Sequence, residues 1–285
     1  MNYKSITQLN WDILNWLQEL PHGFDLIVGI PRSGLLIANL LSLYLNLPVT
    51  DVDGLLNNRV LSYGERLKST TNRSLLKNDE KLNILVVDDS LWSGNQINDV
   101  RNQIMQRGLR HTIRYGVLYI FPGTQRQVDY FFEEVPFPRI FQWNIMNSNV
   151  IEKSCVDIDG VLCLNPSEDE NDDGVNYIQF LENAKPYWIP KVRIKAIVTC
   201  RLEKYRKITK TWLQKYCIEY ESLHMMDLPD KIARIEYGHA KYKAEIFNSI
   251  GAKYFIESSY KQACEISKLI QRPVFCVETM DFIKY

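Results

Sequence analysis

Residues 85–95 read LVVDDSLWSGN, an apolar run that ends in two adjacent acids and leads through a short loop into a helical pattern. The acids are Asp88 and Asp89, and the loop contains Ser93 and Gly94. Ligands of open parallel sheets bind at the C-terminal ends of strands, and backbone N–H groups at a helix N-terminus suit a phosphate. Two carboxylates suit vicinal hydroxyls and a divalent cation. The motif therefore predicts a site for a phosphorylated sugar, although an Asp-Ser-Gly turn with a helix N-cap would account for part of it.

Apolar runs alternate with helical periodicity on both sides of this motif. In the first half, expected strands at residues 25–30, 83–88, 114–121 and 138–143 alternate with expected helices at 35–45, 94–107 and 125–134. In the second half, expected strands lie at 154–158, 193–199, 253–257 and 273–277, and expected helices at 202–216, 239–250 and 260–270. Such alternation is typical of parallel sheets. It predicts an α/β fold with two tandem parallel-sheet domains, residues 1–148 and 149–285.

The composition is that of a soluble globular protein. Hydrophobic residues make up 46% and charged residues 24% of the 285 residues, and 34 basic residues balance 34 acidic ones. This balance disfavours a nucleic-acid binder. The six cysteines form no CxxC pair, and the N-terminus has no apolar core of a signal peptide. We expect a cytoplasmic protein with reduced thiols and no transmembrane segment, and the sequence does not indicate its oligomeric state.

Residues 85–95 resemble the signature of the type I phosphoribosyltransferase family, which is an apolar strand, Asp-Asp, three residues, Thr/Ser and Gly. GIPRSG at residues 29–34 resembles the pyrophosphate loop of that family, and the polar segment 57–82 stands where the family has a flexible catalytic loop. The resemblance covers residue 25 to about residue 143. It implies phosphoribosyl diphosphate as the donor, Mg²⁺, and a catalytic Arg32 facing the leaving diphosphate. The donor-binding residues that it implies are Arg32, Ser33, Gly34, Asp88, Asp89, Ser90, Ser93, Gly94 and Asn95.

Two positions depart from the family pattern. Trp92 stands where members that act on 6-oxopurines have an acid that contacts the base, which argues against that kind of purine salvage. The indole could stack on an acceptor ring or simply pack against its neighbours. Gln96 replaces the usual threonine, so one phosphate contact is not expected.

Residues 154–164, SCVDIDGVLCL, resemble the first motif of the haloacid dehalogenase superfamily. The resemblance covers residue 153 to the C-terminus and implies a Rossmann-like phosphatase domain. Asp157 would be the nucleophile and Asp159 the general acid and base, and Thr199 would bind the phosphoryl group. Lys243 is preferred over Lys241 as the lysine that neutralises charge. The implied Mg²⁺ ligands are Asp157, Asp159 and Glu257.

The motif spacing limits any additional cap over the phosphatase site. Thirty-nine residues separate Asp159 from Thr199, and 43 separate Thr199 from Lys243. This predicts a small cap or none, and an open site suits a bulky substrate. The acidic run at residues 168–173 is expected to be a solvated loop; with Tyr177, Tyr187 and Trp188 it could instead form a small flap.

A transferase of this class leaves a 5-phosphate on its product, and a phosphatase can remove it. The pair resembles dual-domain ribofuranosyltransferases of bacterial surface-polysaccharide assembly. We expect transfer of 5-phosphoribosyl to a glycan or lipid-linked glycan hydroxyl, followed by dephosphorylation through an aspartyl-phosphate. Two alternatives remain: a nucleobase phosphoribosyltransferase combined with a nucleotide phosphatase, and a regulator that binds phosphoribosyl diphosphate.

Overall fold

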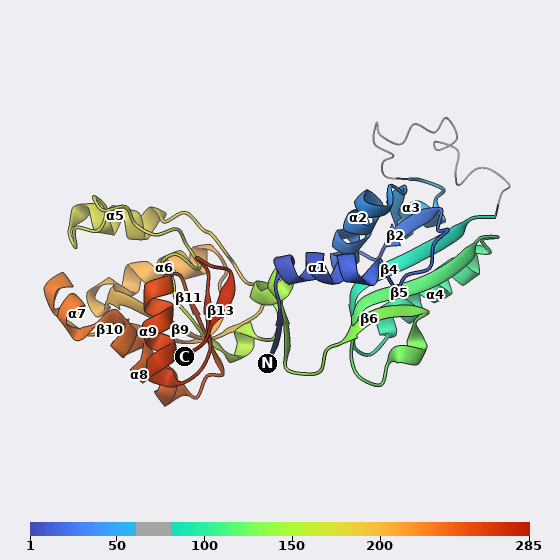
Figure 1. The fold of residues 1–285 in the computed structure, drawn as a ribbon. Coiled ribbons are helices and arrows are strands. Elements are labelled where there is room, and N and C mark those ends of the chain that lie inside the picture. Colours follow the sequence, from blue (N-terminus) through green and yellow to red (C-terminus); the bar gives the residue numbers. More distant parts are fainter. Residues whose placement is uncertain (61–80) are drawn as a thin grey trace. The chain divides into compact units, whose positions relative to one another are not determined.

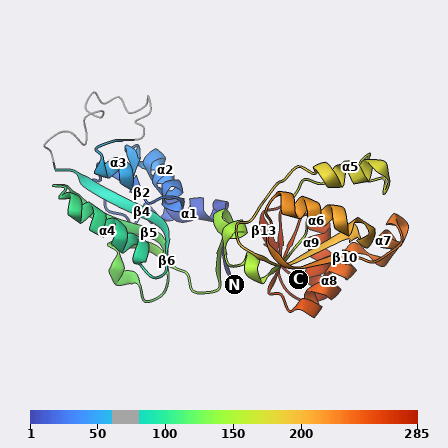
Figure 2. The same cartoon turned by 180° about the vertical axis from the view of Figure 1, so that it is seen from behind.

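The computed structural model describes residues 1–60 and 81–285 (Figures 1 and 2). It divides into two compact units, Met1–Arg139 and Ile140–Tyr285. Each unit is built around a sheet with parallel strands, which confirms the predicted α/β class. Most of the polar segment 57–82, namely residues 61–80, lies outside the described residues. In the described part of the chain, every helix is too short or too polar to cross a membrane.

The first unit contains a five-stranded parallel sheet in the order β3-β2-β4-β5-β6. Its strands are β2 (Leu26–Gly29), β3 (Val49–Asp51), β4 (Asn83–Leu91), β5 (Thr112–Ile120) and β6 (Tyr130–Glu134). Its helices are α1 (Ile6–Trp16), α2 (Ser33–Leu45), α3 (Val52–Leu56) and α4 (Asn95–Arg107), and a short strand β1 (Asn2–Lys4) precedes them. The chain leaves β2 toward β3 on one side and returns to β4 on the other. A switch in direction of this kind opens a crevice at the C-terminal ends of the two central strands.

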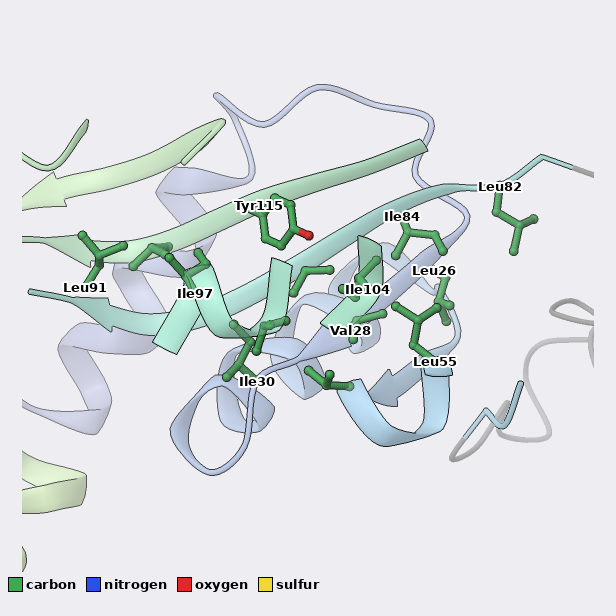
Figure 3. Close-up of a cluster of buried hydrophobic side chains, with 14 of the residues drawn as sticks. Leu26, Val28, Ile30, Leu55, Leu82, Ile84, Leu91, Ile97, Ile104 and Tyr115 are labelled. Atoms are coloured by element: carbon green, nitrogen blue, oxygen red, sulfur yellow. The ribbon is translucent and has the colours of Figure 1, made fainter. Parts of the chain in front are cut away.

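Helices cover both faces of this sheet, which is why its strands read as continuous apolar runs. Helices α3 and α4 cover one face, where a cluster of buried side chains forms the core shown in Figure 3. Helices α1 and α2 pack against the strands from the other side. The cluster in Figure 3 includes Leu26, Val28, Ile30, Leu55, Ile84, Leu91, Ile97, Ile104 and Tyr115.

Of the sequence-based predictions up to residue 143, one is wrong and one is correct only in part. Residues 125–134 were expected to form a helix, but they form a 3₁₀ turn at Gln125–Gln127 and the edge strand β6. The aromatic run Tyr130-Phe131-Phe132 fits a pleated, half-buried surface, and β6 pairs with β5 in parallel. Only Arg139–Phe141 of residues 138–143 is a strand, β7, and the 3₁₀ helix Gln142–Asn147 follows it.

The second unit contains a six-stranded sheet in the order β10-β9-β8-β11-β12-β13. The strands are β8 (Ser154–Val156), β9 (Ile194–Leu202), β10 (Tyr220–Met226), β11 (Tyr254–Glu257), β12 (Val274–Cys276) and β13 (Asp281–Ile283), of which β13 alone is antiparallel in this sheet of described residues. The helices are α5 (Val175–Asn183), α6 (Arg206–Lys215), α7 (Lys231–Tyr237), α8 (His239–Ile250) and α9 (Tyr260–Ile270). The direction of strand addition reverses between β8 and β11, which places a second crevice at their C-terminal ends.

The bounds expected for α8 and α9 are confirmed, and each helix has one clear end signal. Ser259 caps α9 by accepting a hydrogen bond from the Gln262 N–H, and Gly251 ends α8 in the left-handed conformation. The helix expected at residues 202–216 begins only at Arg206, because β9 continues to Leu202. Helices α8 and α9 pack against the sheet over a core that includes Phe247, Phe255 and Ile266.

Candidate active sites

Asp88 and Asp89 lie near the C-terminal end of β4, at the crevice of the first unit. They are 6% and 3% exposed, although β4 continues past them to Leu91. Burial, followed by the nearby charge of Asp89, raises the pKa of Asp88 to about 8. Two carboxylates held this close are stabilised in their charged form by a cation or by hydroxyl donors. The pair can therefore bind either a divalent cation or the vicinal hydroxyls of a sugar.

The GIPRSG loop reaches these acids through the start of α2. Gly34 packs so closely against β4 that a Cβ atom there would lie 2.6 Å from the Val87 carbonyl oxygen and 3.0 Å from Asp88 Oδ1. Only glycine allows this approach, so the two motifs from distant parts of the sequence meet in one place. Arg32 lies just before α2, with an exposed side chain and a cis peptide bond to Pro31. Ser33 is the first residue of α2.

The end of β4, the short loop that follows it and the start of α4 complete the crevice. Ser90, Ser93, Gly94 and Asn95 line a cavity of about 190 Å³ together with Asp88. Gly94 adopts a left-handed conformation with φ of 82° immediately before α4. Ser90, Ser93, Gly94 and Asn95, which were predicted to bind the donor, thus line the same cavity as Asp88.

Gln96 links the two loops. Its side-chain amide donates a hydrogen bond of 3.0 Å to the carbonyl oxygen of Pro31. The residue that departs from the family pattern therefore has a structural contact in place of the phosphate contact of threonine. This contact holds the start of α4 against the loop that carries Arg32.

Trp92 is 62% exposed, so it is not simply a packed core residue. One edge of its indole contacts Phe137, with ring centroids 5.6 Å apart and nearly perpendicular. Arg139, a residue that sequence reasoning missed, lines the same cavity and donates a 3.1 Å hydrogen bond to the Leu91 carbonyl. Burial lowers the pKa of Arg139, and the charge of Asp89 offsets only part of that shift. No motif marks Arg139, because it reaches the cavity from a segment far along the chain.

The crevice of the second unit contains a buried cluster of opposite charges. Lys243 on α8 is 2% exposed, and its Nζ lies 2.7 Å from Asp157 Oδ2 and 2.7 Å from Glu257 Oε2. Nζ also donates to Gln262 Oε1 at 3.1 Å. Burial lowers the pKa of Lys243, but Asp157 and Glu257 raise it well above its usual value, so the lysine stays charged. Burial raises the pKa of Asp157 to about 7, although Lys243 opposes that shift.

Lys241, the alternative lysine, lies elsewhere. Its Nζ is 4.8 Å from the ring centre of Tyr237, and the side chain is exposed. Of the two candidates, Lys243 is thus the one that meets both acids. Helical periodicity separates them, because residues two apart lie on opposite faces of a helix, and Lys243 shares the buried face of α8 with Ala240, Ala244 and Phe247.

Asp159 is paired with Arg201, which sequence reasoning also missed. Arg201 Nη2 lies 2.6 Å from Asp159 Oδ1 and Nε lies 3.1 Å from Oδ2, which is a two-pronged contact. The Arg201 side chain is fully buried. Thr199 is 1% exposed on the same strand, and its hydroxyl accepts a 3.3 Å hydrogen bond from the Arg201 N–H. The sequence TCR at residues 199–201 was a possible signal, since an arginine that continues an apolar strand is buried and needs a charged partner.

The predicted metal ligands do not form one group. In residues 1–60 and 81–285, no three acidic, histidine or cysteine side chains lie close enough together to hold a metal ion. Asp157 and Glu257 converge on the Lys243 ammonium, whereas both carboxylate oxygens of Asp159 face Arg201. Mg²⁺ is commonly held by one or two carboxylates together with phosphate oxygens and water. Asp157 and Glu257 fit that pattern, and the Asp159 side chain does not.

The loops around this cluster fit closely. Gly160 has φ of 78°, and a Cβ atom there would lie 2.4 Å from the Cβ of Ser258. The backbone N–H groups of Ser258 and Ser259 donate to Glu257 Oε1 at 3.0 and 3.3 Å. The turn after Asp159 is therefore packed against the turn after β11, which keeps Glu257 in a fixed orientation.

Part of the acidic run at residues 168–173 is held in place by hydrogen bonds to other segments. Asp173 accepts hydrogen bonds from Lys204 Nζ at 3.0 Å and from the Tyr205 hydroxyl at 2.7 Å. Tyr177 on α5 packs edge-on against Tyr205, with ring centroids 5.2 Å apart. The expectation of a wholly solvated loop is thus wrong at its C-terminal end, because Asp173 connects α5 to the start of α6.

Comparison with protein families gives a match to the phosphoribosyl transferase domain over residues 2–145, just over half of the chain. A comparison with curated proteins gives no match. Among solved structures, the xanthine-guanine-hypoxanthine phosphoribosyltransferase of Helicobacter pylori is 18% identical, with a TM-score of 0.37 over 50% of this chain and 93% of that one. A purine phosphoribosyltransferase from Pyrococcus horikoshii is 22% identical, with a TM-score of 0.36 over 50% and 92%. On the family match, the chain belongs to the phosphoribosyl transferase domain family.

Proposed function

We propose that the chain is a bifunctional ribofuranosyltransferase. Its first unit transfers 5-phosphoribosyl from phosphoribosyl diphosphate to a hydroxyl of a glycan or lipid-linked glycan. Its second unit, a phosphatase of haloacid dehalogenase type with its functional residues in 149–285, then removes the 5-phosphate. The observation that carries the second activity is the buried cluster of Asp157, Lys243 and Glu257 at the reversal point of the second sheet.

In the transfer step, the bond between the anomeric carbon and the diphosphate oxygen breaks, a bond to the acceptor oxygen forms, and the proton of the acceptor hydroxyl passes to the released diphosphate or to solvent. Asp88 and Asp89 orient the ribose through its two hydroxyls, while the loops at Ser33 and Ser93 offer backbone N–H groups to phosphates. The exposed guanidinium of Arg32 grips the departing diphosphate with two parallel hydrogen bonds. Mg²⁺ bound at this site would neutralise further charge on the diphosphate.

In the hydrolysis step, the Asp157 carboxylate attacks phosphorus and the bond to the ribose O5 breaks. Asp159, once it is released from its two-pronged contact with Arg201, gives the leaving oxygen a proton, and later takes a proton from the water that cleaves the aspartyl-phosphate. Lys243 holds Asp157 in its charged form, and Thr199 binds the phosphoryl group. Asp157 and Glu257 would hold Mg²⁺, and that ion would offset the charge of the phosphate.

The direct test is to incubate the protein with phosphoribosyl diphosphate, Mg²⁺ and a panel of saccharides and nucleobases, and to read the products by mass. A saccharide should gain a pentose in two mass steps, first with phosphate and then without. Guanine, hypoxanthine and orotate should give no nucleotide. Nucleotide formation with no labelled saccharide would favour nucleobase salvage, and binding without turnover would favour a regulator.

Two variants separate the proposed activities. Asp157→Asn should stop phosphate release while transfer continues, so that the phosphorylated product accumulates. Arg32→Ala should weaken transfer and leave hydrolysis of a preformed 5-phosphoribosyl product intact. If Asp157→Asn abolished diphosphate release as well, the two-site proposal would be wrong.

A further inference from the structure

We propose that a cleft beside Asp159 binds the neutral glycan part of the phosphorylated product, an inference that rests on the phosphatase function proposed above. The cleft has a volume of about 480 Å³, which is within the range of small-ligand sites. It lies among the segment after the catalytic turn, helix α5 and the residues that follow α5. Amide and acid side chains form most of its polar lining: Asn165, Asp169, Glu170, Asn176, Gln179 and Asn183.

Two residues that line the cleft lie close to the neighbours of Asp159. Asn165 Nδ2 lies 2.8 Å from the position of a Cβ atom on Gly160, the residue next to Asp159. Phe180, which lines the cleft, lies with its ring centre 5.8 Å from the guanidinium carbon of Arg201. Arg201 also holds both carboxylate oxygens of Asp159. It therefore contacts Phe180, on the apolar side of the cleft, and Asp159, the proposed general acid.

The lining suits hydroxyl groups. A side-chain amide offers both donors and an acceptor, which matches a hydroxyl that donates and accepts. The amides of Asn165 and Gln179 have no hydrogen-bond partner among the described residues, so both can turn toward a ligand. Phe180 adds an apolar surface against which the C–H face of a sugar ring can pack. This combination fits a polyhydroxylated, largely neutral ligand.

The charge of the cleft disfavours a second phosphate. Among the described residues that line it, the charged ones are Asp169, Glu170 and Lys185, which sum to one negative charge. A nucleic acid or a nucleoside diphosphate would bring further negative charge beside these acids. A neutral saccharide meets no such repulsion, so the cleft selects a glycan over a nucleotide chain.

The test compares two substrates of the phosphatase unit in the full chain. One is ribose 5-phosphate, and the other is a synthetic ribofuranosyl-galactose disaccharide phosphorylated at the ribose 5-position. Gln179→Ala and Asn165→Ala should each lower kcat/KM for the disaccharide about three- to tenfold, the effect of one lost hydrogen bond, and leave ribose 5-phosphate unchanged. Glu182→Ala, on the same helix but outside the lining of the cleft, is the matched control and should change neither. Equal effects on both substrates, or no effect on either, would overturn the proposal.

A second comparison tests the charge argument. The wild type should hydrolyse the phosphorylated disaccharide at least about tenfold better than a 5′-phosphorylated dinucleotide. Asp169→Asn removes one negative charge and should raise kcat/KM for the dinucleotide relative to that for the disaccharide about two- to threefold, the usual size of one exposed charge interaction. A wild type that prefers the dinucleotide would show that the cleft takes a nucleic acid instead.

Failure of the phosphatase proposal is distinguishable from failure of the cleft proposal. If the wild type with Mg²⁺ hydrolyses neither substrate, the phosphatase proposal is wrong. The proposal that the cleft binds a glycan is then tested by a binding measurement alone. Saturation-transfer NMR with the unphosphorylated ribofuranosyl-galactose disaccharide then measures occupancy. A signal that is weakened by Gln179→Ala but kept by Glu182→Ala supports the cleft, whereas an absent or unaltered signal overturns it.

Discussion

Replacing Lys243 by methionine should lower the free energy of unfolding of the second unit by about 3–5 kcal/mol, the usual cost of removing one partner from a buried ion pair. The ammonium group contacts Asp157 and Glu257 at 2.7 Å each and is almost fully buried. Methionine keeps an unbranched side chain of similar length but removes the cation that both carboxylates contact. The loss therefore reports charge rather than packing.

The magnitude follows from the geometry. At an effective dielectric constant of about 20, each contact at 2.7 Å corresponds to about 6 kcal/mol of attraction. The carboxyl groups recover part of this by taking up a proton, because removal of Lys243 raises the pKa of Asp157 further. A raised pKa in the folded state means that the folded state binds more protons, so falling pH favours folding of the variant. The deficit should be about 1–2 kcal/mol smaller at pH 6 than at pH 8.

Urea unfolding of the full chain, followed by hydrogen exchange of peptides from residues 253–270, measures the second unit separately. Lys241→Met on the same helix is the matched control and should cost less than about 1 kcal/mol, because its side chain is exposed. Adding Glu257→Gln to Lys243→Met should recover part of the loss, since it removes one of the two charges. A loss no greater than that of Lys241→Met would refute the reasoning.

Three further outcomes are expected. Gly34→Ala should cost about 1–3 kcal/mol and reduce diphosphate release, because its Cβ would lie 2.6 Å from the Val87 carbonyl; thermal unfolding and a transfer assay measure both effects. Burial, then Arg234 and Lys243, lowers the pKa of His239 to about 4, so the contribution of His239 to stability is lost as pH falls from about 6.5 toward 4. His239→Gln removes that loss, so the difference in melting temperature between pH 7 and pH 5 should be smaller in the variant than in the wild type. Cys217 is exposed and should react first with a thiol reagent, whereas Cys200, whose pKa burial raises to about 12, should react only after unfolding.

Local patterns were reliable wherever the sequence carries its own signals. The α/β class follows from apolar runs that alternate with helical periodicity, and the end of α8 at Gly251 and the start of α9 at Ser259 follow from local capping residues. The helix expected at residues 125–134 failed because its polar residues fit a helical period, whereas pairing with β5 makes Tyr130–Glu134 an edge strand. Pairing with a neighbour overrides local propensity at such positions.

The sequence by itself determined the two strand–loop–helix motifs, because each is a continuous segment whose apolar run, acids and glycine are local requirements. Only the tertiary structure decided which distant groups complete them. The contact of Gly34 with β4, the position of Arg139 in the first cavity and the pairing of Arg201 with Asp159 all join residues that are remote in sequence. These pairings depend on strand order and helix packing, and the physical need to compensate a buried charge can be met by any partner that the fold brings within reach.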